Sequence, residues 1–434
     1  MASALPRFDD WPEARLRRPM TAGAVPVPTS LGPGDVAQLI TESRMQAYAL
    51  PLVHAPWMSQ ALPGLIPRET RATCTDCAMC SQAARPDSPY VYFDPQVKCC
   101  SYLPCLANFL VGGILANADP EAEVGRASVV ERIGRRDGVR PIGLLMTAGY
   151  ARVYDQMTSG FGRSAALRCP HFVVTETGGH CGIWAHRPSV CTTYFCKHDR
   201  GAVGERFWHS LRDWLWALEA ELSTWCALEL GAPPEAVPPT SPPEPGSSSG
   251  ESLEAADDES AYASAWGRWN RRELEFYEQC AELVKQLDSA AVSRIASPQV
   301  HELSEVVRQN YGELISEAVP ARLAVGKFSM DGTEEDGYRA TAYSIFDPLR
   351  LSGRLARAIP LFTGQPWEVA TKDIQAELGF TIDRSLLRRM VDFGILVGSD
   401  EDQDGRDESR FKELERSHQV AGVPEAPAPS LPAA

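Results

Sequence analysis

The chain has 434 residues, of which 44% are hydrophobic and 23% are charged, so it is long enough for two or three domains with buried cores. Its 33 glycines and 34 prolines are too few for a protein that is disordered or fibrous throughout. The net charge of −15 is concentrated in residues 231–260 (seven acids, no base) and 400–434 (nine acids, four bases), which argues for solvated segments and against a nucleic-acid surface.

No part of the sequence is typical of a membrane helix or a secretory signal. No run of 18 apolar residues occurs, and the stretch Phe109–Leu115 is short and contains two glycines. The N-terminus carries acids and prolines where a signal peptide needs an apolar core. We therefore expect a protein of the cytoplasm that does not enter a membrane.

Residues 1–70 are predicted to be an N-terminal extension. They contain ten prolines and short apolar stretches, and one helix is expected at Asp35–Tyr48. The remainder is expected to follow the next domain in extended form.

Residues 71–204 are predicted to form a metal-binding domain, because ten of the twelve cysteines fall there. Two-residue gaps let thiolates converge on one ion or cluster, but they suit disulfide pairing poorly. We predict one or two metal sites, with ten candidate ligands: Cys74, Cys77, Cys80, Cys99, Cys100, Cys105, Cys169, Cys181, Cys191 and Cys196. Cys226 and Cys280 lie on helical patterns and are expected to be small buried hydrophobic residues.

The motifs CTDCAMC and CPHFVVTETGGHCGIWAHRPSVCTTYFC resemble those of the YkgJ-type cysteine-cluster family, a zinc- or iron-chelating domain. The matching positions are Cys74, Cys77, Cys80, Cys169, Cys181, Ile183, Trp184, Arg187, Pro188, Cys191 and Cys196. The fourth opening cysteine of the family is replaced by Ser81, so Cys99, Cys100 and Cys105 become candidates for the missing ligand. The resemblance implies an iron–sulfur cluster or zinc. Some relatives are linked to methylation of flagellin lysines, so it implies methyl transfer as well.

The cysteine spacing favours an iron–sulfur cluster, of the [4Fe–4S] type, with zinc as the alternative. A single C-x-x-C-x-x-C run followed by widely spaced cysteines is closer to ferredoxin ligation than to the paired knuckles of a zinc ribbon. For His171, His180, His186 and His198, hydrogen bonding around the site is favoured over ligation. Arg187 is expected to donate hydrogen bonds to a carboxylate, to carbonyls or to cluster sulfurs.

Residues 205–230 and 262–319 are predicted to be helical segments, separated by a disordered Pro/Ser-rich acidic linker at 231–261. The first is an amphipathic helix, and a second helix is expected at 263–295, packed against the first as a hairpin. A further helix is expected at 301–319. The tryptophans of these segments are expected to fill a helix–helix core: Trp208, Trp214, Trp216, Trp225, Trp266 and Trp269.

Residues 320–400 are predicted to form a winged-helix-like α+β unit, followed by a disordered acidic tail at 401–434. Strands are expected at 324–328 and 338–345 around the turn MDGTEEDG. Thr371 and Asp383 are predicted N-caps, Gly379 is a predicted C-cap, and Gly394 ends the last helix. DNA binding is disfavoured, because acids flank the arginines at 384–389 and the unit has no wider basic patch.

The predicted fold class is α+β, mostly helical and loop-rich, with a metal-centred cysteine domain, a helical hairpin and a winged-helix-like C-terminal unit. No dinucleotide, Walker, GxSxG, HExxH or radical S-adenosylmethionine signature occurs, so no catalytic residue is assigned. We predict a cysteine-cluster metalloprotein with a redox role or a role in modifying a protein or peptide substrate. The alternatives are a zinc-stabilised protein-interaction module and, by resemblance, a lysine methylase-like methyltransferase.

Overall fold

The computed structural model describes residues 50–72, 74, 77–80, 93–176, 178–237 and 259–399. Contacts divide the chain into Met1–Thr41 and Glu42–Ala434, and every described residue belongs to the second unit. The helix expected at Asp35–Tyr48, most of the predicted linker and the acidic tail lie outside the described residues. Within the described part, no helix is long and apolar enough to cross a membrane.

Up to the linker, the chain carries its cysteines between and on short elements. The helices are η3 (Leu52–His54), α2 (Ala55–Ala61), α3 (Asn108–Ala116), η4 (Pro120–Ala122), α4 (Glu123–Arg135), α5 (Ala148–Gln156), η5 (Thr158–Gly160), η6 (Ala165–Leu167), η7 (Trp184–His186), α6 (Ser189–Thr192) and α7 (Gly201–Glu229). The strands are β1 (Leu106–Ala107), β2 (Val139–Arg140), β3 (Gly143–Leu144), β4 (Phe172–Thr175) and β5 (Gly178–Cys181).

The remaining elements begin with η8 (Pro234–Ala236). The helices that follow are α8 (Glu259–Trp266), η10 (Gly267–Trp269), α9 (Glu273–Lys285), α10 (Ser289–Ile295), α11 (Pro298–Ile315), α12 (Gly353–Ala358), η11 (Ile359–Leu361), α13 (Trp367–Leu378) and α14 (Arg384–Asp392). The strands are β6 (Arg322–Val325), β7 (Ser329–Thr333), β8 (Gly337–Thr341), β9 (Leu349–Leu351), β10 (Thr363–Pro366) and β11 (Leu396–Gly398).

The described sheets are small and antiparallel, with the orders β1-β3-β2, β4-β5, β7-β8-β9 and β10-β6-β11. Helices make up much of the rest of the described chain. The molecule therefore has mixed helix and sheet, as the predicted α+β class requires.

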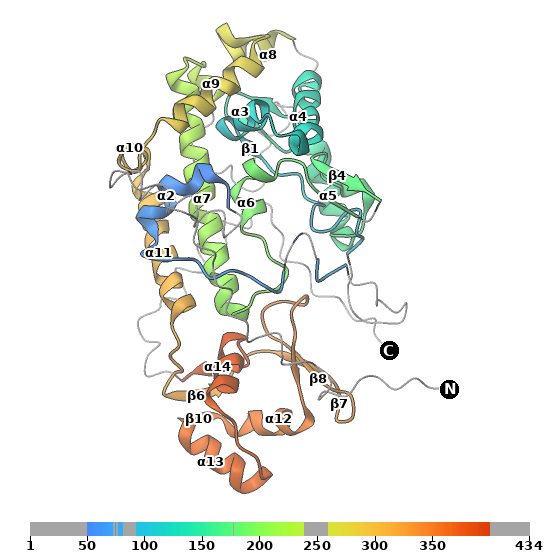
Figure 1. The fold of residues 1–434 in the computed structure, drawn as a ribbon, viewed down its shortest axis with the longest axis vertical. Coiled ribbons are helices and arrows are strands. Elements are labelled where there is room, and N and C mark those ends of the chain that lie inside the picture. Colours follow the sequence, from blue (N-terminus) through green and yellow to red (C-terminus); the bar gives the residue numbers. More distant parts are fainter. Residues whose placement is uncertain are drawn as a thin grey trace, which may run out of the picture. The chain divides into compact units, whose positions relative to one another are not determined.

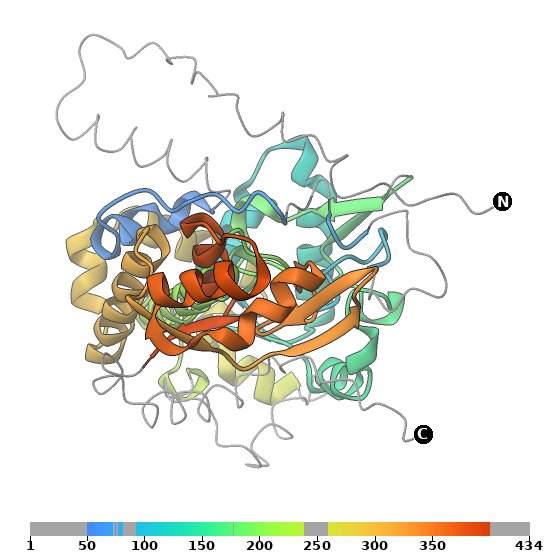
Figure 2. The same cartoon turned by 90° about the horizontal axis from the view of Figure 1, so that it is seen from below.

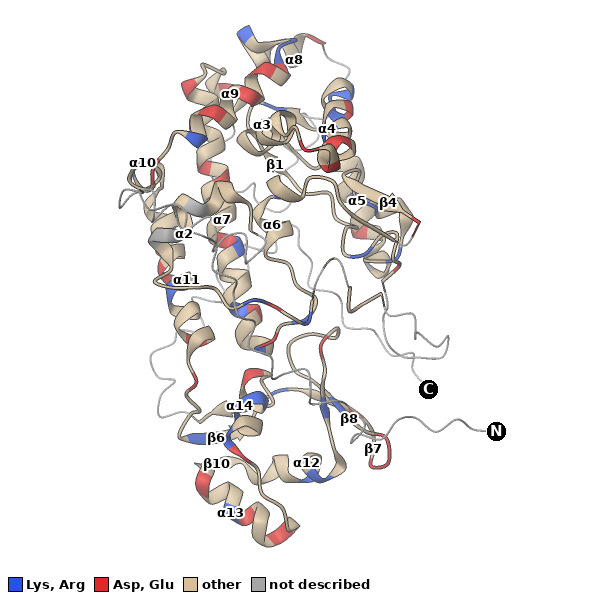
Figure 3. Ribbon diagram, viewed as in Figure 1, with Lys and Arg blue, Asp and Glu red and all other residues tan. Residues whose placement is uncertain are grey.

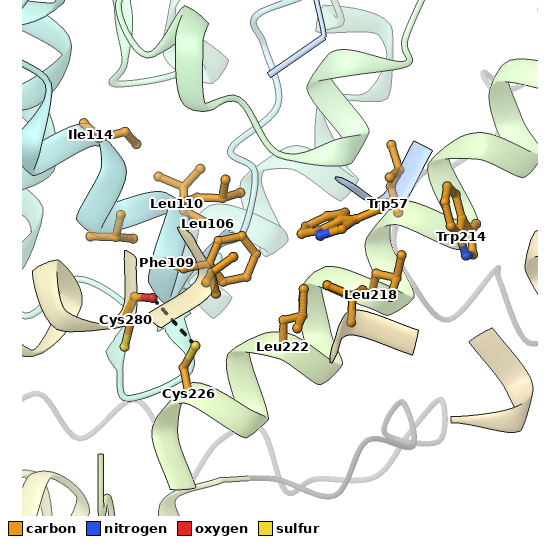
Figure 4. Close-up of a cluster of buried hydrophobic side chains, with 14 of the residues drawn as sticks. Trp57, Leu106, Phe109, Leu110, Ile114, Trp214, Leu218, Leu222, Cys226 and Cys280 are labelled. Atoms are coloured by element: carbon orange, nitrogen blue, oxygen red, sulfur yellow. Dashed lines mark hydrogen bonds between the residues drawn. The ribbon is translucent and has the colours of Figure 1, made fainter. Parts of the chain in front are cut away.

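The long helix α7 runs through the larger hydrophobic core. Its apolar residues recur at three- and four-residue steps and are buried, because that spacing places them on one side of a helix. α11 packs along α7, and α3 packs against α9 (Figure 1). Cys226 and Cys280 are fully buried in this core, where the Cys226 thiol donates to the Cys280 carbonyl at 3.8 Å (Figure 4). Both predictions for these cysteines are confirmed.

Most of the tryptophans also fill this core. Trp208, Trp214, Trp266 and Trp269 are buried, and Trp225 is partly buried against them. Trp216 differs: its side chain keeps 41% of its surface exposed, because it lies off the apolar side of α7.

A close helix–helix contact occurs where α3 meets α9. A β-carbon on Gly112 would lie 1.9 Å from the carbonyl oxygen of Tyr277, so a glycine is required at this crossing. The Tyr277 hydroxyl donates to the Arg140 carbonyl at 2.7 Å, which ties α9 to the small sheet beside α3.

The prediction of one helix at 263–295 was wrong, because the backbone breaks twice. Arg271 has a φ of 66°, in the left-handed region, and separates η10 from α9. Asp288 has an extended backbone and accepts a hydrogen bond from the Ala291 amide at 2.7 Å, so it caps α10 as a new helix. In addition, α9 packs chiefly on α3, and the main partner of α7 is α11.

Residues 322–398 have a hydrophobic core of their own. Figure 2 shows α12, α13 and α14 grouped with the hairpin of β7 and β8. Two predicted caps are confirmed: Gly379 has a φ of 72° after α13, and Asp383 accepts the Leu386 amide at 2.8 Å at the start of α14. The core includes Leu323, Leu351, Phe362, Ile374, Leu387, Met390, Phe393 and Ile395.

Two local predictions in this unit were wrong. α13 begins at Trp367, so Thr371 lies inside the helix, where its hydroxyl donates to the Glu368 carbonyl at 3.1 Å instead of capping. The segment MDGTEEDG is not a turn throughout, because its first residues belong to β7. Gly332 and Gly337, with φ of 127° and 79°, flank the shorter turn between β7 and β8.

Candidate metal centre

All twelve cysteines lie within the described residues, and none forms a disulfide. The ten predicted ligands lie on loops and short elements. Cys181 ends β5, Cys191 lies in α6, and Cys196 lies in the loop that leads into α7.

The cysteine-bearing segments meet in space although they lie far apart in the sequence. The Cys169 amide donates to the Cys100 carbonyl at 2.7 Å. Lys98 Nζ donates to the carbonyls of Cys74 and Gly179, each at 2.8 Å, and so joins the first cysteine loop to β5. Nine thiols lie close enough to interact electrostatically: Cys74, Cys77, Cys80, Cys99, Cys100, Cys169, Cys181, Cys191 and Cys196.

The adjacent thiols of Cys99 and Cys100 interact with each other and lie between two overlapping groups of thiols. Cys99 interacts with the thiols of Cys74, Cys77, Cys80 and Cys196, and also with those of Cys181 and Cys191. The thiols that interact with Cys100 are Cys169, Cys181 and Cys191. Further interactions, such as that between Cys74 and Cys181, connect the two groups.

Cys105 has a different environment from the other nine. Its thiol interacts with the backbone amide of Met146, and its charged neighbour is Arg132. The tenth predicted ligand therefore lies at the edge of the thiol group.

Two basic side chains lie among the thiols. Arg187 is 4% exposed and interacts electrostatically with Cys74, Cys100, Cys181 and Cys191. Its guanidinium lies 3.2 Å from the centre of the Trp184 ring. Lys98, whose φ of 51° is in the left-handed region, interacts with Cys74 and Cys80 as well. Together these residues place positive charge where thiolates would form.

Loss of solvent favours the neutral form of several of these thiols. Burial is the largest cause that raises the pKa of Cys74 and of Cys181 to about 11, and that of Cys80 and Cys196 to about 12. Neighbouring thiols raise these pKa values further. Arg187 lowers the pKa of Cys74 and Cys181, Lys98 lowers that of Cys74 and Cys80, and Lys197 lowers that of Cys196. A metal that binds here would have to displace protons, as thiolate ligation generally does.

Among the described residues, no three His, Cys, Asp or Glu side chains are arranged so that they could hold a metal ion. The thiols therefore lie near one another, but no three of the described ones are placed to bind the same metal ion. The chemistry of the donors nevertheless fits zinc or an iron–sulfur cluster, both of which are bound by sets of thiolates. A coordination sphere therefore requires these thiols to come closer together.

The four histidines near the cysteines differ in environment. His171 is buried, its Nδ1 lies 2.8 Å from the Ser128 hydroxyl, and burial lowers its pKa to about 3. His198 is also buried, with a pKa lowered to about 3 for the same reason. His180 is exposed and His186 is half-buried. His171 and His198 are therefore neutral side chains inside the protein.

The position of Cys191 depends on a buried carboxylate that the sequence did not single out. Glu219 on α7 accepts hydrogen bonds from the amide and hydroxyl of Ser189, which begins α6. The oxygen that accepts from the Ser189 amide, Glu219 Oε1, also lies 3.0 Å from His54 Nε2. The signal in the sequence was a charged residue on the apolar side of a helix, between Leu215 and Leu222.

A second buried carboxylate supports the loop that leads to the first cysteines. Glu69 accepts the Trp208 indole N–H at 2.7 Å and the Asp199 amide at 2.6 Å. Asp199 in turn accepts the Thr70 amide at 3.0 Å, and Arg71 donates to Asp347 at 2.8 Å. The chain just before Cys74 is therefore held by both α7 and the C-terminal unit.

Comparisons with protein-family models, with curated proteins and with solved structures found no match.

Proposed function

We propose that residues 74–196 form a metal centre ligated by cysteine thiolates, and that an iron–sulfur cluster is the favoured group. The observation that carries this proposal is the gathering of nine thiols from distant segments around Arg187 and Lys98. Free thiols that gather from distant segments without forming disulfides are expected where a metal holds them.

The charge balance of the site supports thiolate ligation. Four thiolates around a zinc ion, or around a [4Fe–4S] core of charge +2, leave two negative charges in a buried place. Arg187 and Lys98 supply two positive charges next to the thiols, which balance one such group. Burying both signs together costs less than burying either one alone.

The two groups around Cys99 and Cys100 are the ligand sets that we propose. Cys99 with Cys77, Cys80 and Cys196, or with Cys74 in place of one of them, would hold one metal group. Cys100 with Cys169, Cys181 and Cys191 would hold a second. Cys105 is left outside both sets, because its charged neighbour is Arg132.

Zinc is the second candidate, and one observation favours it. Described residues 74 and 77–80 belong to no helix or strand, so their placement depends on loop contacts. A structural zinc would contribute folding energy to such a loop. In that case the chain would be a protein-interaction module rather than a redox protein.

For the cluster-bearing protein we propose a redox role or a role in modifying a protein or peptide. Methyl transfer is a third hypothesis and rests on the family resemblance. We propose a protein-contact or structural role for the C-terminal winged-helix-like unit, because Arg388 on α14 makes its hydrogen bonds within the chain and not toward a nucleic acid. It donates to Asp392 at 2.7 Å and to the Ala318 carbonyl at 2.5 Å. Acidic and basic residues are also intermixed on α4 and α14 (Figure 3).

The test is anaerobic purification of the full chain, followed by analysis of iron, sulfide and zinc and a visible absorption spectrum. Matched iron and sulfide with broad absorption near ~400 nm, as clusters give, would support the iron–sulfur proposal. A colourless protein that retains zinc would support the second candidate. A protein with neither metal after growth in metal-supplemented medium and anaerobic handling would refute both. The Cys226→Ala variant serves as a control that removes a thiol outside the site.

A further inference from the structure

A cavity of about 320 Å³ lies between α4, α5 and the segment that leads to Cys169. Its volume is at the lower end of the range for small-molecule sites. Leu103 and Pro170 form part of its wall, and these residues stand two and one positions from Cys105 and Cys169. The cavity therefore adjoins the thiol group without being part of it.

Arg132 is a buried basic residue in the wall of this cavity. Its side chain is 6% exposed, and its Nη2 donates to the carbonyls of Leu145 at 2.9 Å and Asp137 at 3.2 Å. Its Nη1 is buried in the described structure and has no hydrogen-bond partner. A buried guanidinium nitrogen without an acceptor is costly, and a bound anion would satisfy it.

The charges and hydrogen bonds of the other polar groups in the cavity wall are compatible with a bound anion. Glu131 is paired with Arg135, so their charges offset each other. The Tyr150 hydroxyl is already committed, since it donates to the Leu167 carbonyl at 2.8 Å. Arg168, which is half-buried on the cavity wall, adds a second guanidinium.

The remaining acid on the wall is Asp137, which interacts electrostatically with Arg132. Two arginines against one aspartate give the cavity a net positive charge. The planar donors of arginine match the oxygens of carboxylates and phosphates.

We infer that this cavity binds a small molecule through an oxyanion, a carboxylate or a phosphate, held by Arg132 and Arg168. The bound molecule would lie beside Cys169 and Cys105, which both interact with Arg132. This site does not depend on which metal the thiols hold. It gives the predicted metal centre a neighbouring ligand site that the cysteine motifs do not include.

Isothermal titration calorimetry of the purified full chain, with inorganic phosphate and with succinate as separate probes, tests this inference. We expect at least one probe to bind. Whether phosphate, succinate or both bind would show which oxyanion the cavity prefers. Arg168→Gln is expected to weaken binding about tenfold or more, because one charged hydrogen bond is lost. Arg354→Gln, an exposed arginine on α12, is expected to bind like wild type.

Arg132→Gln is expected to abolish binding. Circular dichroism and metal content are compared with wild type, because this residue is buried. If Arg132→Gln does not fold, Arg168→Gln alone decides the question. Failure of both probes to bind at up to about 10 mM would overturn the inference, because a site with two arginines should reach at least millimolar affinity. Binding that Arg168→Gln leaves unchanged would overturn it as well.

Discussion

The carboxylate of Glu219 accepts two hydrogen bonds from Ser189, one from its amide and one from its hydroxyl, each at 2.8 Å. Ser189 begins the short helix α6, and Cys191 lies two residues further along it. The long helix α7 thus fixes a candidate metal ligand through a polar contact inside the hydrophobic core. A short helix such as α6 would not hold its own position, because four residues make few internal hydrogen bonds.

Replacing Glu219 by alanine is expected to reduce the free energy of unfolding by about 3–5 kcal/mol, because His54 and both Ser189 donors lose their buried acceptor. Urea unfolding followed by circular dichroism measures this change. Glu219→Gln should cost less, since one acceptor oxygen remains. Glu278→Gln, an exposed position on α9, should stay within about 0.5 kcal/mol of wild type. Equal stability of Glu219→Ala and wild type would contradict the role given to this carboxylate.

Serine substitutions should show which of the ten candidate cysteines bind metal and which do not. Cys77→Ser and Cys191→Ser are expected to lose at least half of the bound metal, because each would remove one thiolate from a proposed set of four. Cys105→Ser is expected to keep most of it, since Cys105 lies at the edge of the group. Metal analysis of the purified variants is the readout.

Cys226→Ala is the matched control for this series, since its thiol is buried in the helical core. Its metal content should equal that of wild type. The proposed ligand sets are wrong if Cys105→Ser loses as much metal as Cys191→Ser.

The stability of the protein should depend on pH through Glu69. Burial is the main cause that raises the pKa of this carboxyl from 4.5 to about 7. The native state therefore keeps a proton that the unfolded state has lost, so the unfolding free energy falls as pH rises from about 4.5 to about 7. The loss from this group is at most about 3 kcal/mol. Glu69→Gln cannot ionise and should lose less stability over this range.

Urea unfolding of both proteins at several pH values checks this prediction. The buried histidines His171 and His198 act in the opposite direction, since their lowered pKa values reduce stability as pH falls below about 6.5. They are present in both proteins, so the difference between the two pH profiles isolates Glu69. Parallel profiles would show that Glu69 titrates normally.

The helix crossing at Gly112 predicts a large difference between two glycine-to-alanine substitutions. Gly112→Ala is expected to destabilise the protein by more than about 2 kcal/mol, because the new β-carbon would collide with the Tyr277 carbonyl. Gly134→Ala, on α4, meets nothing within 4 Å and should stabilise by about 0.5–1 kcal/mol. Thermal unfolding followed by circular dichroism measures both. Similar effects of the two substitutions would argue against the close crossing.

The sequence predicted the features that depend on local pattern. The spacing of apolar residues located α7, and the caps at Gly379 and Asp383 located the ends of α13 and α14, because these signals act within a few residues. The breaks at Arg271 and Asp288 were missed, since a continuous apolar pattern does not reveal a left-handed residue or a new cap.

The candidate site shows the same limit. The cysteine spacing identified its thiols, whereas Glu219 and Lys98 contribute through contacts with residues distant in the sequence. The contacts that gather the thiols around Cys99 and Cys100 likewise arise from tertiary packing. No local pattern carries such information.

The thiols that gather in the folded protein are spread along the chain from Cys74 to Cys196, and the carboxylate that fixes α6 comes later still, at residue 219. A ribosome releases the N-terminal residues first, so the opening cysteines leave the exit tunnel long before their spatial neighbours exist. Neither Cys99 nor Cys100 can acquire its full set of neighbours until α7 has been synthesised. Loading of the proposed metal would therefore be a late event in the biogenesis of this protein, and the early thiols would have to remain reduced until then.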